Sequence, residues 1–238
     1  TLLSFLFLPV SIFAQEIKNN PTSNHGNKFE QLGTILPTPN IYRTGSGAPG
    51  QGYWQNRADY DITAYLDEDK RNLKGSETVT YYNNSPDGLE YLWLQLDENE
   101  HSSVKNAGYD SSTFLPKLAN SDDLKPSELP VKNNGYGVNL DKVTDAAGKP
   151  LNYVVNKTMM RIDLPQVLKK GQKFIFKIDW NYDISDRMKM GGRGGYEFFP
   201  EDGNDLYTIT QWYPRMCVYS DFKGWQHNQF TGRGEFAL

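Results

Sequence analysis

Metal-dependent hydrolysis needs histidine and carboxylate side chains at fixed spacings, and this chain offers few histidines. It contains three, His25, His101 and His227. The commonest hydrolytic zinc helix carries His-Glu-x-x-His, because residues four apart place both imidazoles on one helix face. No two of these histidines are four residues apart. The chain therefore lacks that zinc motif, and we expect each histidine to be an ordinary surface or loop residue.

Neighbouring carboxylates are a second possible source of chemistry, since two of them flanking a cleft can hydrolyse a glycosidic bond. They occur at three places, namely Asp59 with Asp61, Asp67 to Asp69, and Asp122 with Asp123. The set beginning at Asp67 falls in an expected turn and lacks the full pattern of a calcium loop. A glycosidase is thus a hypothesis that rests on carboxylate abundance alone.

Two further motifs for catalysis are incomplete. The glycine-rich stretch 191–195 reads Gly-Gly-Arg-Gly-Gly, without the Lys-Ser/Thr that ends a phosphate-binding loop. The Gly-x-Ser-x-Gly sequence of a serine hydrolase does not occur. We therefore predict no catalytic, cofactor-binding or metal-binding residue in this chain.

The first residues predict export. Residues 2–13 are an apolar run, followed by Ala14 and then by polar residues. This is the pattern of a signal peptide with its cleavage site, and the run is shorter than the roughly 20 residues that span a bilayer. We assign residues 1–14 to a signal peptide with a truncated start, with a buried helix as the alternative, and expect a periplasmic or extracellular protein without a stable membrane span.

Composition narrows the class of protein further. The net charge is −4 and no basic stripe is present, so nucleic-acid binding has no electrostatic basis. The single cysteine, Cys217, cannot form an internal disulfide, and we expect it to be a buried structural thiol. Aromatic residues make up 13% of the chain and fall in alternating runs, which favours an all-β core.

Alternation of apolar and polar residues predicts a series of short strands that would have to position any site. We expect them at residues 57–66, 73–83, 89–96, 138–143, 151–156, 158–164, 173–182 and 206–213. Gly75 would be a bulge in the second strand. This pattern predicts a large antiparallel β-sandwich or saddle-shaped sheet. Residues 15–52, rich in Asn, Pro, Thr and Gly, would be a disordered leader or flexible linker.

Several segments together resemble the N-terminal domain of the aminopeptidase N family of exported zinc metallopeptidases (gluzincins). They are Tyr53-Trp-Gln-Asn-Arg-Ala-Asp-Tyr-Asp-Ile62, Leu73 to Pro86, Leu89-Glu-Tyr-Leu-Trp-Leu-Gln-Leu96 with Asn99, Thr210-Gln-Trp-Tyr-Pro-Arg-Met-Cys-Val-Tyr219, Gly224-Trp-Gln-His227 and Gly234-Glu-Phe236. The resemblance covers residues 53–238. It implies an N-terminal β domain at 53–205 and last strands with a junction at 206–238, leading towards a catalytic domain that this chain lacks.

The resemblance implies what the parent protein does. Zinc would be bound by the missing catalytic domain, with peptides as substrates, and the present chain would be an inactive fragment that binds no zinc. Gln211 matches a family glutamine that lines the first substrate subsite, so its amide would contact the peptide backbone or the free amine. The alternative is a strand glutamine that faces solvent. Trp212 and Tyr213 would pack between the domains. The alternative is a stand-alone exported β-sandwich that binds a glycan or a protein.

Overall fold

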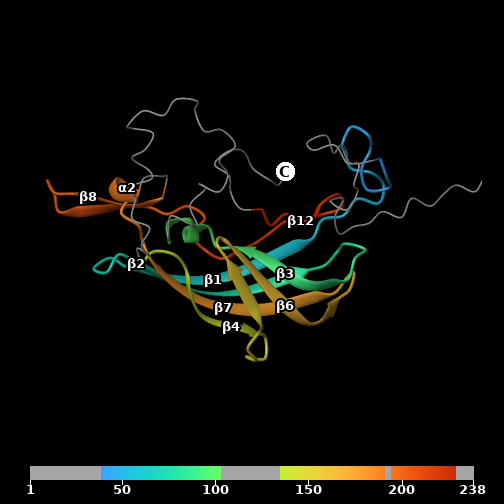
Figure 1. The fold of residues 1–238 in the computed structure, drawn as a ribbon, viewed down its shortest axis with the longest axis horizontal. Helices are drawn as coiled ribbons and strands as arrows, with labels where there is room; N and C mark the ends of the chain where they lie inside the picture. The colour runs from blue at the N-terminus through green and yellow to red at the C-terminus, as the bar shows by residue number, and fades with distance from the viewer. Residues whose placement is uncertain (1–38, 103–134, 191–193, 229–238) are drawn as a thin grey trace, which may run out of the picture.

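The structure, a computed structural model, describes residues 39–102, 135–190 and 194–228 and consists mainly of two four-stranded antiparallel sheets. The first has the order β1-β2-β7-β4 and the second has the order β10-β3-β6-β5. Figure 1 shows the long strands of the first sheet bowed along their length. The bounds are β1 Arg57–Asp67, β2 Asn72–Tyr82, β3 Leu89–Gln95, β4 Asn139–Asp145, β5 Tyr153–Asn156, β6 Met159–Leu168, β7 Lys173–Asp183 and β10 Arg215–Met216.

The β1–β2 hairpin confirms the expected first two strands. The strands pair in continuous register from Arg57 opposite Tyr82 to Asp67 opposite Asn72. The backbone N–H of Lys70 donates to Asp67 Oδ1 at 3.1 Å, which closes the polar turn. A short turn of this kind brings sequential strands together antiparallel and places β2 where its other edge can receive β7.

Strand β7 shows the clearest match between pattern and burial. Phe176, Ile178, Trp180 and Tyr182 alternate along the strand and are all buried. Gly75 of β2 lies opposite Trp180 in unbroken register, so the expected bulge at this glycine is wrong. A Cβ on Gly75 would lie 2.2 Å from Trp180 Cζ2, and the residue must be glycine because the indole ring covers its backbone.

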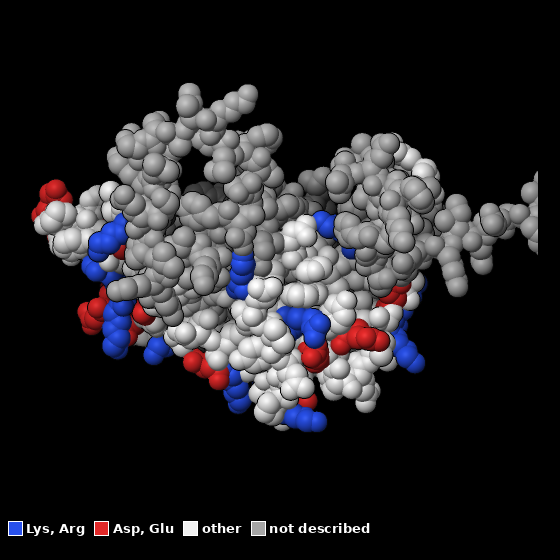
Figure 2. All heavy atoms as spheres, viewed as in Figure 1, with Lys and Arg blue, Asp and Glu red and all other residues white. Residues whose placement is uncertain are grey.

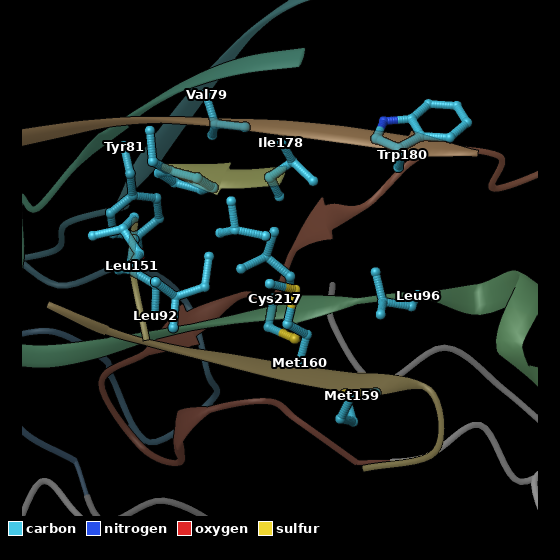
Figure 3. Close-up of a cluster of buried hydrophobic side chains, with 14 of the residues drawn as sticks. Val79, Tyr81, Leu92, Leu96, Leu151, Met159, Met160, Ile178, Trp180 and Cys217 are labelled. Carbon is cyan, nitrogen blue, oxygen red and sulfur yellow. The ribbon is translucent and has the colours of Figure 1, made fainter. Parts of the chain in front are cut away.

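The core lies between the two sheets and confirms the all-β sandwich. Figure 3 shows Val79 and Ile178 of the first sheet facing Leu92 and Met160 of the second, with Cys217 between the layers. Buried side chains alternate with more exposed ones along most of β2, β3 and β7, as expected when one face of a sheet packs on another. Burial of the apolar side chains on these two faces is the main stabilising contribution.

Four short strands and two short helices complete the described structure. They are η2 Asp97–His101, α2 Arg187–Met190, β8 Gly195–Phe199, β9 Asn204–Thr208, β11 Tyr219–Ser220 and β12 Gly224–Trp225. Strand β8, the first strand of the β8–β9 hairpin, is not among the expected strands. The expected strand over 206–213 is too long, because β9 ends at Thr208 and the chain then turns.

Part of the expected linker makes defined contacts. The N–H of Gly50 donates to the Tyr42 carbonyl at 2.7 Å, and Arg43 Nε donates to Asp221 Oδ1 at 2.7 Å. Hydrogen-bonded structure is therefore already present ahead of Tyr53. The expected signal peptide, most of the glycine-rich stretch at 191–195 and the last part of the expected junction, residues 229–238, lie outside the described residues.

Charged side chains are mixed on the described surface. On the face drawn in Figure 2, Lys and Arg side chains alternate with Asp and Glu side chains over the sheets. This agrees with the small net charge of −4. Within the described ranges, no helix has the length and apolar character needed to span a membrane.

Candidate functional site

The segment from Thr210 to Tyr219, here called the junction segment, contains the candidate substrate contact Gln211 and is attached to both sheets. Met216 pairs with Leu94 of β3 in the second sheet. Its backbone N–H donates to the hydroxyl of Tyr60, on β1 of the first sheet, at 2.8 Å. The segment therefore spans the two layers, and its position is fixed by backbone hydrogen bonds to each.

An ion pair adds to this attachment. Arg215 Nε donates to Asp97 Oδ2 at 2.8 Å, and a second guanidinium nitrogen lies 3.3 Å from Asp97 Oδ1. Both side chains are partly buried. A two-point contact of this kind fixes direction as well as distance, because the planar guanidinium matches the carboxylate. Arg215 is thereby oriented against the short helix η2.

A row of aromatic side chains connects the junction segment to the first sheet. Trp212 lies 5.9 Å from Trp180 and 5.1 Å from Tyr213, measured between ring centroids, and Tyr213 lies 5.3 Å from Tyr60. These spacings are those of favourable edge-to-face and tilted aromatic pairs. Trp212 and Tyr213, which we expected to pack between domains, thus contact side chains of their own domain.

Gln211 stands out from these anchored neighbours. It is exposed, and its side chain makes no hydrogen bond to any described residue. Its φ of 51° places the backbone in the left-handed region, which ends the expected strand before this residue. Because the residue is exposed, its amide presents one acceptor and one donor group to solvent.

A partly buried carboxyl group lies near the same turn. A Cβ placed on Gly194 would be 3.5 Å from Thr210 Oγ1 and 4.0 Å from Glu98 Oε1, so both side chains approach this glycine. Burial, with smaller contributions from Asp97 and Glu100, raises the pKa of Glu98 to about 7. Sequence patterns did not indicate this residue, because its surroundings come from segments about a hundred residues away in the chain.

The described residues do not fit a zinc site. No group of three or more His, Cys, Asp or Glu side chains that could hold a metal occurs in the described parts of the chain. His227 stacks on Trp93 at 4.5 Å between centroids, with Nδ1 2.9 Å from the Trp225 carbonyl oxygen. Cys217 is buried, as expected, and burial raises its pKa to about 12, which keeps it a neutral thiol.

Comparison with known proteins gives a partial likeness in fold. No family model and no curated protein matches the sequence. An M1 zinc metallopeptidase from Deinococcus radiodurans is 13% identical, covers 63% of this chain and 25% of its own, and has a TM-score of 0.36. A two-domain M1 zinc metallopeptidase variant bound to L-arginine is 14% identical, with coverages of 69% and 28% and a TM-score of 0.37. The chain thus spans about a quarter of the length of these structures.

Proposed function

We propose that this chain is the N-terminal, non-catalytic domain of a secreted zinc-dependent aminopeptidase. The sequence resemblance over residues 53–238 suggests it. The observation that supports it best is the junction segment, which is fixed to both sheets while Gln211 remains exposed. A rigid β scaffold that presents one polar side chain at its edge suits a domain that forms one wall of a substrate cleft.

The roles in this proposal are divided between two domains. The missing C-terminal domain would hold the zinc, which activates a bound water and polarises the scissile carbonyl. The present chain would support that domain, and the Gln211 amide would hydrogen-bond the first residue of the peptide substrate. The exposed left-handed turn suits a substrate contact. Its backbone belongs to the junction segment, which is attached to both sheets, so the amide would need little reorganisation to bind a peptide.

The coding sequence after Leu238 gives the first test. We expect the frame to continue into His-Glu-x-x-His with a further glutamate downstream. The longer protein should release N-terminal residues from peptides and lose this activity to a chelator, whereas residues 1–238 alone should hydrolyse nothing. A frame that closes soon after Leu238, or continues without these ligands, would refute the peptidase assignment.

The role of Gln211 can be tested in the longer protein. We expect Gln211→Gly to raise KM for peptide substrates by about tenfold, the effect of one lost hydrogen bond. Glycine tolerates the left-handed backbone, so the change removes the amide without strain. Gln51→Ala, which truncates another exposed glutamine, is the control and should leave KM unchanged. Equal kinetics for wild type and Gln211→Gly would show that the amide does not contact substrate.

A further inference from the structure

A pocket of about 470 Å³ lies at the end of the molecule opposite the β8–β9 hairpin. Its lining comes mainly from residues between Arg43 and Tyr60 and between Met216 and Gln226, together with Tyr81. In Figure 1 the blue N-terminal loop and the red segment with β12 come together here, and the Arg43–Asp221 contact joins them. The volume falls within the range of about 300–1,000 Å³ that is typical of small-molecule sites.

The pocket contains buried polar atoms that have no partner. Trp54 Nε1, Asp221 Oδ2 and Gln226 Oε1 are all buried, and none makes a hydrogen bond to a residue that the structure describes. All three side chains line the pocket. The Asp221 side chain is 4% exposed and Gln226 is 6% exposed. Buried polar groups in folded proteins are nearly always paired with protein or ordered water, so this one donor and these two acceptors are available to a polar ligand.

The charges around the pocket are already neutralised. Arg43 Nε donates to Asp221 Oδ1 at 2.7 Å, and its guanidinium lies 5.7 Å from the Tyr53 ring and 5.2 Å from the Phe222 ring. Arg57 pairs with Asp59 at 2.6 Å. Because both arginines have acidic partners, the described residues that line the pocket offer no free positive charge for a phosphate and no free negative charge for an amine.

Aromatic rings form the opening and one wall. Phe222 and Tyr53 remain 41% and 36% exposed although both line the pocket. Trp54 stacks on Tyr219 at 5.9 Å between centroids, which holds the indole in place. Exposed rings next to an ion-paired carboxylate, an amide and an indole N–H suit a ligand with an apolar face and several hydroxyl groups, since each hydroxyl can both donate and accept.

We propose that this pocket is a binding site for a neutral carbohydrate of one or two sugar units. Because these atoms are buried, small rotations of their side chains would have to accompany binding, after which sugar hydroxyl groups would donate to Asp221 Oδ2 and Gln226 Oε1 and accept from Trp54 Nε1. The C–H face of the ring would lie on Phe222 or Tyr53. The inference does not depend on the peptidase proposal, because none of these residues belongs to the surroundings of Gln211.

Titration of residues 1–238 with neutral sugars tests this site. The probes are glucose, galactose, mannose, N-acetylglucosamine, cellobiose and maltose, followed by calorimetry and tryptophan fluorescence. We expect saturable binding of at least one of them with a dissociation constant on the order of 1 mM or below. If none of the six sugars binds saturably, the proposal is wrong.

Two variants with a matched control locate the binding. Phe222→Ala and Phe198→Ala each remove an exposed phenylalanine that packs on an arginine, but only Phe222 lines the pocket. We expect Phe222→Ala to weaken sugar binding by about tenfold or more and Phe198→Ala to leave it unchanged. Trp54→Phe keeps a ring while removing the N–H donor, and it should also weaken binding. Equal affinity for all of these proteins would place the sugar elsewhere and refute the assignment.

Discussion

At the scale of single residues, the most unusual side chain is Glu77. It lies in the middle of β2, opposite Ile62 on one side and Ile178 on the other, and is 1% exposed. Neither carboxyl oxygen has a hydrogen-bond partner in the described part of the chain, and the titratable side chain of Tyr60 interacts with it. Burial raises the pKa of Glu77 to about 8, so the folded protein favours the neutral acid.

This shift predicts that stability falls as pH rises. The unfolded chain releases the Glu77 proton near pH 4.5, whereas the folded protein holds it until about pH 8. Between these values the folded state binds more protons, so the free energy of unfolding should decrease by up to about 1.4 kcal/mol per pH unit. Denaturant unfolding of wild type and Glu77→Gln from pH 5 to pH 8 measures this slope.

The two glutamate variants should behave differently. Glu77→Gln should lose the decrease in stability over this interval, because the amide does not titrate. Glu90→Gln changes an exposed glutamate on β3 and should keep it. If wild type and Glu77→Gln keep the same pH dependence, the Glu77 carboxyl must ionise without a penalty, which contradicts its burial.

At the scale of elements, alternation was sufficient to predict most strands but not where they end. The strands β1, β2, β3 and β7 follow the sequence pattern closely, because each has one face in the core. The left-handed turn at Gln211 and the β8–β9 hairpin could not be predicted in this way. They depend on packing against Trp180 and on contacts of Arg71 with Asp205, which are distant in sequence.

The pairing of Gly75 with Trp180 gives a prediction about these elements. Gly75→Ala should lower the free energy of unfolding by about 1–3 kcal/mol, because the new methyl group meets the indole ring. Trp180→Leu alone should also destabilise, since it leaves a cavity. The double variant should be more stable than the sum of the two changes implies, because leucine leaves room for the methyl group. Strict additivity in denaturant unfolding would show that the ring moves aside freely.

At the scale of the whole molecule, Cys217 reports on the integrity of the sandwich. It is the chain's single cysteine, it lies between the sheets, and its pKa of about 12 leaves almost no thiolate at neutral pH. We expect a thiol reagent to modify it only when the domain opens. Labelling should therefore rise with denaturant in parallel with the loss of β-sheet circular dichroism.

A different result is equally informative. Rapid labelling in buffer, with the circular dichroism of the folded protein intact, would mean that the pocket side of the sandwich opens locally. A single buried thiol could be expected from the sequence. The pocket beside it could not, because its two walls come from the beginning and the end of the described chain, and periodicity carries no information on such distant contacts.

The distance along the chain between Arg43 and Asp221 has a consequence for biosynthesis. Their contact joins residues 178 positions apart. The pairing of β2 with β7 also joins distant parts of the chain, so it forms only after β7 has been made. At about 5–20 residues per second, a ribosome needs on the order of 10–40 s to proceed from one to the other. Strand β7 follows β2 by about 100 residues, so for about 5–20 s of this interval the nascent β1–β2 hairpin has an unpaired edge, to which other chains can add. The newly made polypeptide should therefore depend on a chaperone that shields this edge until translation has supplied β7.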